Sequence, residues 1–215
     1  ELFTELERRT GLGTGFRRTG SILLATTQGR WDEAKRNASM ARLCGIEAEV
    51  VGADRVAEMW PLLDPTEVLG ALFLPGDGVA NPTDVTQAIA KAARMGGARI
   101  FEHTKVTGVL RRNGRVAGVS TERGDIAAEY IVNCTGMWAR ELGARSDVAI
   151  PLHAAEHFYL VTEPVPGLDP DLPVLRMPDD TAYVRVDTGK LMVGFFEPGA
   201  KPWARLSRMR SEKVP

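Results

Sequence analysis

Two short stretches of this 215-residue chain carry residues whose types and spacing could do chemistry. The first is the apolar run that begins at Ile131, meets a turn at Thr135-Gly136, and resumes as a predicted helix at Trp138. A strand that ends in such a turn leaves bare backbone at the carboxyl edge of a sheet, and open α/β sheets bind cofactors at that edge. The first stretch therefore predicts a cofactor-binding turn.

The second stretch is His153-Ala-Ala-Glu156-His157, which matches the H-x-x-E-H pattern of some zinc peptidases. Zinc binding would need a helix, because residues four positions apart share a face only there. The flanks instead favour a strand, since Pro151 precedes the motif and the β-branched and aromatic run 158–162 follows it. In a strand the two histidines would stand about 13 Å apart. We therefore expect no metal, and a zinc hydrolase using His153 and His157 stays as an alternative.

Composition excludes several other classes of protein. The chain carries 27 basic and 28 acidic residues, with a formal net charge of −1, so it offers no electrostatic footprint for nucleic acid or an anionic membrane surface. No run approaches the roughly 18 apolar residues of a membrane helix. Cys44 and Cys134 are too few for a disulfide framework, which makes a reducing cytoplasm the expected location.

Helix and strand signals alternate along the chain and predict an α+β or α/β fold. The clearest helix signal is Asn81-Pro82, an N-cap followed by proline at the first helical position, with Gly96-Gly97 closing the helix. The clearest hairpin signal is Asn113-Gly114, because both turn positions tolerate positive φ. The expected strands are 21–26, 47–51, 69–74, 98–101, 106–112, 115–121 and 126–134; the other expected helices are an initial one through Arg9, one over 30–44 and a short one opened by Asp54.

Several separated stretches, in the right order, resemble one family. They are Thr14-Gly-Phe-Arg-Arg-Thr-Gly-Ser21, the segments 74–84, 131–139 and 151–163, and Val193-Gly-Phe-Phe-Glu-Pro-Gly-Ala-Lys-Pro-Trp203. Together they resemble FAD-dependent amine oxidoreductases of the dimethylglycine and sarcosine dehydrogenase family. The resemblance implies FAD as cofactor and an N-methylated amino acid as substrate, oxidised at a methyl carbon to an iminium. That iminium yields formaldehyde or passes its one-carbon unit to folate, so folate or an electron acceptor are expected partners of the full protein.

The resemblance also implies roles for two pocket residues, His157 and Tyr183, which it makes catalytic. Hydride transfer to a flavin needs an amine with a free lone pair, and histidine titrates near neutral pH, which suits it to hold or accept the amine proton. Tyrosine can orient the histidine or hydrogen-bond the substrate carboxylate, and we infer that Arg185 could pair with that carboxylate. Without the resemblance, His157 reads as a half-buried strand histidine and Tyr183 as a cross-strand aromatic beside the turn at Asp187.

On the cofactor side, the resemblance places the backbone of Val106 near the adenine, and Thr135, Gly136 and Trp138 near the ribose and pyrophosphate. Glycine permits close backbone approach there, and a helix N-terminus favours phosphate. The alternative for Trp138 is core packing on the first turn of its helix.

The expected domain organisation is the second half of an FAD-binding domain plus a mixed-sheet substrate-binding domain, incomplete at both ends. Residues 1–76 and 148–203 would belong to the substrate domain and 77–147 to the FAD-binding domain, with 204–215 unassigned. The family's N-terminal strand and G-x-G-x-x-G loop are absent, so we expect an internal fragment that neither holds FAD tightly nor turns over substrate. Its unpaired strand edges would invite self-association. A noncatalytic small-molecule binding module remains the other alternative.

Overall fold

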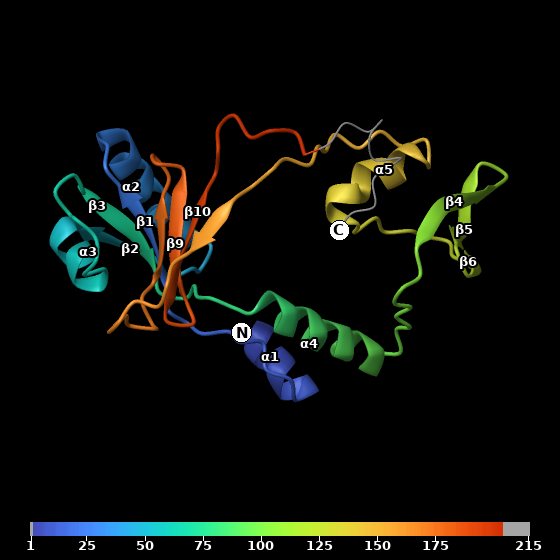
Figure 1. The fold of residues 1–215 in the computed structure, drawn as a ribbon, viewed down its shortest axis with the longest axis horizontal. Helices are drawn as coiled ribbons and strands as arrows, with labels where there is room; N and C mark the ends of the chain where they lie inside the picture. The colour runs from blue at the N-terminus through green and yellow to red at the C-terminus, as the bar shows by residue number, and fades with distance from the viewer. Residues whose placement is uncertain (1, 204–215) are drawn as a thin grey trace. The chain divides into compact units, whose positions relative to one another are not determined.

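The computed structural model describes residues 2–203 and confirms a mixed α/β fold (Figure 1). The chain forms two compact units, one of residues 1–98 with 157–198 and the other of residues 99–156 with 199–215. The polypeptide therefore enters the first unit twice. The expected tail 204–215 lies outside the described residues.

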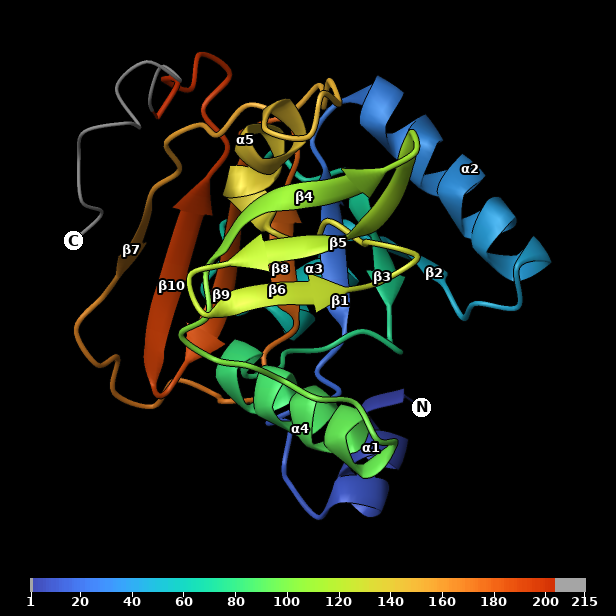
Figure 2. The same cartoon turned by 90° about the vertical axis from the view of Figure 1, so that its right-hand side faces the viewer.

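The first unit is built on a seven-stranded mixed sheet with strand order β2-β3-β1-β8-β9-β10-β7 (Figure 2). Strand β1 pairs with β8 in parallel, and the other neighbours pair antiparallel. The elements of this unit are α1 (Leu2–Thr10), β1 (Ser21–Ala25), α2 (Gln28–Leu43), β2 (Glu49–Gly52), α3 (Ala53–Met59), β3 (Gly70–Leu74), α4 (Pro82–Met95), β7 (Tyr159–Val161), β8 (Val174–Met177), β9 (Ala182–Asp187) and β10 (Lys190–Phe195).

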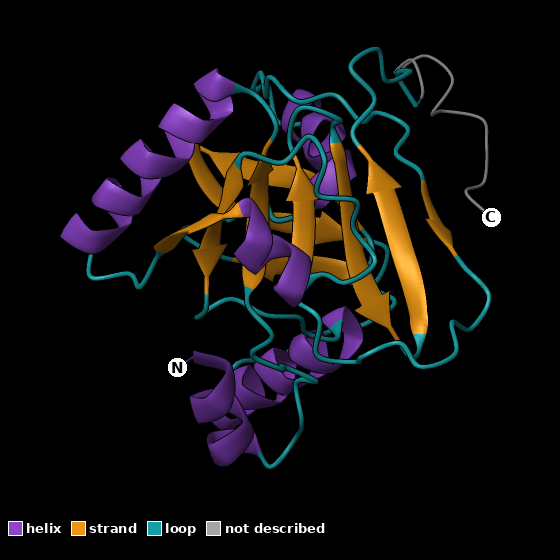
Figure 3. Cartoon of the chain, turned by 90° about the vertical axis from the view of Figure 1, so that its left-hand side faces the viewer, coloured by secondary structure: helices purple, strands orange, loops and turns teal. Residues whose placement is uncertain are grey.

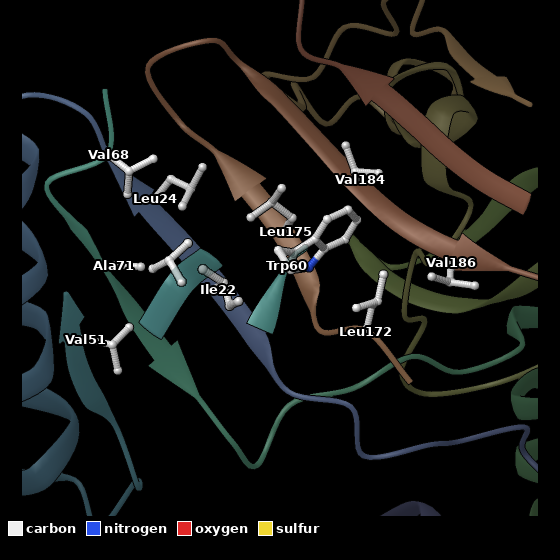
Figure 4. Packing of buried hydrophobic residues seen from close by; sticks show 11 residues of the cluster. Ile22, Leu24, Val51, Trp60, Val68, Ala71, Leu172, Leu175, Val184 and Val186 are labelled. Atoms are coloured by element: carbon white, nitrogen blue, oxygen red, sulfur yellow. The ribbon is translucent and has the colours of Figure 1, made fainter. Parts of the chain in front are cut away.

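The main core lies on one face of this sheet. Because side chains alternate across a strand, Ile22 and Leu24 of β1 point to this face, where Val56 of α3 and Trp60 join them (Figure 4). The indole nitrogen of Trp60 donates a hydrogen bond of 2.7 Å to the carbonyl oxygen of Pro173, so the buried ring keeps its polar atom satisfied. In Figure 3, α3 lies in front of the strands.

The opposite face carries a second, smaller core. Leu23 of β1 points to this face and packs with Leu72 against the buried alanines Ala34 and Ala38 of α2. Helix α2 contacts β1, β2 and β3. On this same face, side chains of β9 remain partly exposed, which leaves room for a site.

The strongest helix and hairpin predictions are confirmed. The side chain of Asn81 accepts hydrogen bonds from the backbone N–H groups of Thr83 and Asp84 at 2.9 and 3.2 Å, capping α4. Helix α4 packs beside α1 (Figures 1 and 2). In the second unit, Asn113 and Gly114 have φ of 51° and 74° and form the turn between β4 (Val106–Arg112) and β5 (Arg115–Thr121). No described helix is both long and apolar enough to cross a membrane.

The second unit contains a three-stranded antiparallel meander and a short helical segment. Strand β6 (Gly124–Ala127) pairs with β5, and a 3-10 turn, η1 (Gly136–Trp138), leads into α5 (Ala139–Ala144). A guanidinium nitrogen of Arg111, near the end of β4, donates a 2.6 Å hydrogen bond to the carbonyl oxygen of Ser146. This contact ties the meander to the segment that follows α5.

Two expected strands are wrong. Residues 98–101 form no strand, and the strand expected over 126–134 ends at Ala127. Beyond one backbone hydrogen bond from Ala128 to the carbonyl oxygen of Ala117, the described residues 128–134 that follow join no ladder, and Tyr130 and Val132 are 87% and 83% exposed. A strand needs a partner for its backbone N–H and C=O groups, and no described strand pairs with either segment. The apolar strand expected before Thr135 is therefore absent, whereas the helical turn after Gly136 is present.

Candidate functional site

Strand β9 places two of the candidate site residues on one face of the large sheet. Its buried residues, Ala182, Val184 and Val186, alternate with partly exposed Tyr183 and Arg185. The buried set joins the main core, because period-two alternation sends it to that side. Tyr183 and Arg185 consequently point to the opposite, open face.

Three rings cluster near the two ends of residues 157–198, the second stretch of chain in the first unit. The imidazole of His157 stacks on the ring of Phe196, with centroids 5.2 Å apart, and lies 6.5 Å from the ring of Tyr183. The rings of Tyr183 and Phe196 are 5.5 Å apart. Nδ1 of His157 also lies 3.8 Å from a carboxylate oxygen of Glu197, within ion-pair distance when the imidazole is protonated. The structure thus brings together the two residues that the resemblance made catalytic, and adds Phe196 and Glu197.

The position of the Tyr183 ring depends on a glycine in the neighbouring strand. Tyr183 stands directly opposite Gly194 of β10 in the ladder. A Cβ atom on Gly194 would lie 2.2 to 2.4 Å from the ring and hydroxyl atoms of Tyr183, a distance that no real side chain tolerates. The ring therefore lies over the bare backbone of β10.

A pocket of about 360 Å³ opens on this face. Its lining combines strand residues with a loop that follows β3: Gly78, Val79, Ala80, Val174, Arg176, Tyr183, Arg185 and Phe196.

Two backbone hydrogen bonds between Val79 and Arg17, of 2.8 and 3.0 Å, hold this loop in place. The neighbouring residue must be glycine, because a Cβ atom on Gly78 would lie 2.0 Å from the carbonyl oxygen of Arg17. Of the predicted residues, Tyr183 and Arg185 line the pocket.

Sequence reasoning missed Arg176, Phe196, Glu197 and the loop residues of this site. The loop lies inside the stretch 74–84, and Phe196 and Glu197 lie inside 193–203, both of which carried the resemblance. For Arg176 the only signal is strand register, because it pairs directly with Tyr183 across β8 and β9. Residues directly opposite each other in a ladder point to the same face.

The expected cofactor-binding turn in the second unit is built by the side chain of Asn133. Its oxygen accepts hydrogen bonds from the backbone N–H and the hydroxyl of Thr135, at 3.3 and 2.7 Å, and its amide donates to the Ala139 carbonyl at 3.0 Å. Gly136 has φ of 55° and open space around its α-carbon. Trp138 is 45% exposed in this chain. Val106 begins β4, opposite Thr121.

The H-x-x-E-H stretch does not form the helix that zinc binding would require. Its residues belong to no helix, and Ala155 makes an isolated bridge with Pro202. Nδ1 of His153 lies 3.1 Å from a guanidinium nitrogen of Arg140. Within residues 2–203, no three His, Cys, Asp or Glu side chains are grouped so that they could hold a metal.

The FAD dependent oxidoreductase family, abbreviated DAO, matches residues 1–213. The match covers both units and all the residues discussed above.

Three curated relatives align with 94% of the chain. The mouse (Mus musculus) mitochondrial pyruvate dehydrogenase phosphatase regulatory subunit is 42% identical over 205 residues. The 4-methylaminobutanoate oxidase (formaldehyde-forming) of Paenarthrobacter nicotinovorans is 39% identical over 202 residues, and human (Homo sapiens) mitochondrial sarcosine dehydrogenase is 35% identical over 208 residues. The alignments cover 23%, 24% and 22% of these proteins, so the chain spans about a quarter of their length.

Among solved structures, L-proline dehydrogenase from P. horikoshii superposes with a TM-score of 0.82 at 28% sequence identity. The superposition covers 91% of this chain and 53% of that one.

Proposed function

Because the chain belongs to the FAD dependent oxidoreductase family, we propose that it is part of a flavoenzyme that oxidises an N-methyl amino acid of the dimethylglycine or sarcosine type. One observation supports this most directly. The open face of the large sheet gathers Tyr183 and Arg185 in one pocket and stacks His157 beside them through Phe196. Two relatives have names that specify N-methylated amino acids, 4-methylaminobutanoate oxidase and sarcosine dehydrogenase.

The second unit has features that fit one part of a bound FAD. The turn at Gly136 has open space around its backbone, and the exposed Trp138 ring offers an apolar surface. We propose that Thr135, Gly136 and Trp138 contact the ribose and pyrophosphate, and that the backbone of Val106 contacts the adenine. When bound, FAD supplies the acceptor for a hydride equivalent from the substrate's methyl carbon.

The residues of the pocket would prepare the substrate for that transfer. The substrate amine must lose its proton to expose a lone pair, and the imidazole of His157 is the group that we propose accepts it. Arg185 would pair with the substrate carboxylate, and the hydroxyl of Tyr183 would hydrogen-bond to the carboxylate or orient the histidine. Loss of the hydride then leaves an iminium, which water converts to formaldehyde and the demethylated amine, unless the one-carbon unit passes to folate.

The test uses the complete native gene product under anaerobic conditions. Its visible spectrum is recorded before and after adding dimethylglycine, sarcosine or 4-methylaminobutanoate, with unmethylated glycine as the control. Bleaching of a flavin band by a methylated substrate, with formaldehyde released, is the expected result. A colourless protein, or a flavin that none of these amines reduces, would contradict the proposal.

A second candidate function is a noncatalytic binding module. The 42% identity to a protein named as a regulatory subunit favours it, because that name describes no oxidation. Such a protein would bind a methylated amino acid in calorimetry while its flavin, if any, kept its oxidised spectrum. The same anaerobic experiment therefore separates the two functions.

A further inference from the structure

Arg176 of β8 lines the pocket on the open face of the large sheet. It stands directly opposite Tyr183 in the β8–β9 ladder, and Arg185 lies two residues further along β9. All three side chains consequently share one face of the sheet. The pocket thus carries two guanidinium groups, one beside Tyr183 on the neighbouring strand and one further along β9.

The two arginines differ in how they are compensated. A guanidinium nitrogen of Arg185 lies 3.7 Å from a carboxylate oxygen of Asp187. Arg176, by contrast, makes no side-chain hydrogen bond or ion pair with any other residue in the part of the chain that the structure describes. It is exposed at the pocket rather than covered by packing. A guanidinium presents a planar fork that matches a carboxylate in a bidentate way.

The rest of the lining indicates how a substrate would be oriented. Tyr183 separates Arg176 on β8 from Gly194 on β10, since the ladder places the three side by side. Phe196 follows Gly194 by two residues in the sequence, and its ring stacks on the imidazole of His157. The pocket is therefore lined by two arginines and by the rings of Tyr183 and Phe196, and His157 stacks on Phe196 without lining the pocket itself.

We propose that Arg176 binds the substrate carboxylate and makes the enzyme selective for methylamino acids over methylamines that lack a carboxylate. This inference rests on the proposed amine oxidation. Arg185, which forms an ion pair with Asp187, adds a second positive charge to the pocket. The substrate's nitrogen then lies toward His157 and Phe196.

The test compares N,N-dimethylglycine with its primary amide, in which a neutral group replaces the carboxylate, in the complete flavoenzyme. Anaerobic stopped-flow bleaching of the flavin gives a dissociation constant and a limiting reduction rate for each compound. For Arg176→Gln, the dissociation constant of the acid is expected to rise about tenfold or more, because a charged hydrogen-bond pair is lost. The amide should change less than about twofold, and Arg176→Lys should recover part of the acid's affinity, because a lysine is a point charge without the fork.

The matched control is Arg36→Gln, which removes an exposed arginine from α2 in the same unit. It should leave both compounds unaffected. If Arg176→Gln binds the acid as well as the unaltered enzyme, or weakens acid and amide equally, the assignment of Arg176 is overturned while the amine oxidation stands. If neither compound bleaches the flavin of the unaltered enzyme, the proposed function itself fails and the inference falls with it.

Discussion

The hydroxyl and ring of Tyr183 lie over strand β10 because the residue opposite them is Gly194. The backbone of Gly194 needs no left-handed conformation, so its role is one of space alone. This separates it from the glycines of the turns, which are there for positive φ. An alanine at this position would push the tyrosine ring away from His157 and Phe196.

We predict that Gly194→Ala, made in the complete protein, lowers kcat/KM for the methylamino acid by about tenfold to a hundredfold, because displacement of an orienting group by about 1 Å carries a cost of this size. Kinetics of flavin reduction measure it, and a thermal melt checks that the protein is folded. Gly29→Ala is the control, since a Cβ there meets no atom within 4 Å. Unchanged kinetics in Gly194→Ala would show that the Tyr183 ring has no part in binding or catalysis.

At the scale of elements, the first turn of α2 is tied to the turn between β8 and β9. The carboxylate of Asp179 accepts hydrogen bonds from two guanidinium nitrogens of Arg30, at 3.1 and 2.9 Å, and from the hydroxyl of Thr26 at 3.1 Å. The Arg30 guanidinium, followed by the Thr26 hydroxyl, holds the pKa of Asp179 below its ordinary value of 3.8. This contact links the N-terminal and C-terminal parts of the first unit.

We predict that Asp179→Asn lowers the free energy of unfolding of this chain at pH 7 by at most about 1 kcal/mol, since both side chains remain 29 to 31% exposed. The folded-state pKa is lowered, so the stabilisation is fully present above the unfolded-state pKa and is lost as the pH falls through the folded value. Urea unfolding at pH 7 and pH 5 should show the same difference, which should shrink below pH 4. Asp125→Asn, at an exposed position of β6, is the control. A difference that persists at low pH would exclude the ion pair as its cause.

Elements specified by local chemistry could be predicted from the sequence. Asn81-Pro82 predicted the start of α4, and Asn113-Gly114 predicted the β4–β5 hairpin, because each signal acts within a few residues. Residues 98–101 and 128–134 were wrongly expected to be strands, because an apolar sequence becomes a strand only where another strand lies beside it. That condition is non-local and cannot be read from the segment itself.

The same distinction applies to the candidate site. The resemblance led to His157 and Tyr183, but Arg176 needed the register of β8 against β9. A slip of one residue in that register would turn Arg176 toward the main core and Leu175 toward the pocket. The pocket's membership is therefore a property of the assembled sheet. The roles given to His157, Tyr183, Arg185, Val106, Thr135, Gly136 and Trp138 stay predictions.

The whole chain spans about a quarter of the length of the curated relatives that it matches. The contacts that we propose to FAD come from Val106 and from one turn, in which the Thr135 hydroxyl donates a hydrogen bond to Asn133. The three-stranded meander keeps two strand edges, β4 and β6, and self-association through such edges remains a prediction.

We predict that the 215-residue chain on its own does not retain FAD. One turn supplies too few phosphate contacts to offset the freedom that the dinucleotide loses on binding. After incubation with FAD, gel filtration with detection near 450 nm should show the flavin eluting apart from the protein, whereas the complete gene product should carry it along. Co-elution of flavin with the short chain would contradict the prediction.

In the large sheet, strand β1 lies between β3 and β8. Strand β3 follows β1 closely in the sequence, whereas β8 begins only at Val174. During synthesis on the ribosome, β1, β2 and β3 emerge before β8, and the side of β1 that will pair with β8 stays open while residues 99–156 of the second unit are made. The core around Ile22 and Leu24 also stays incomplete until then, because Leu175 of β8 is part of it. A newly made chain therefore passes through a stage in which one edge of β1 is unpaired, and an open strand edge of this kind favours aggregation during folding.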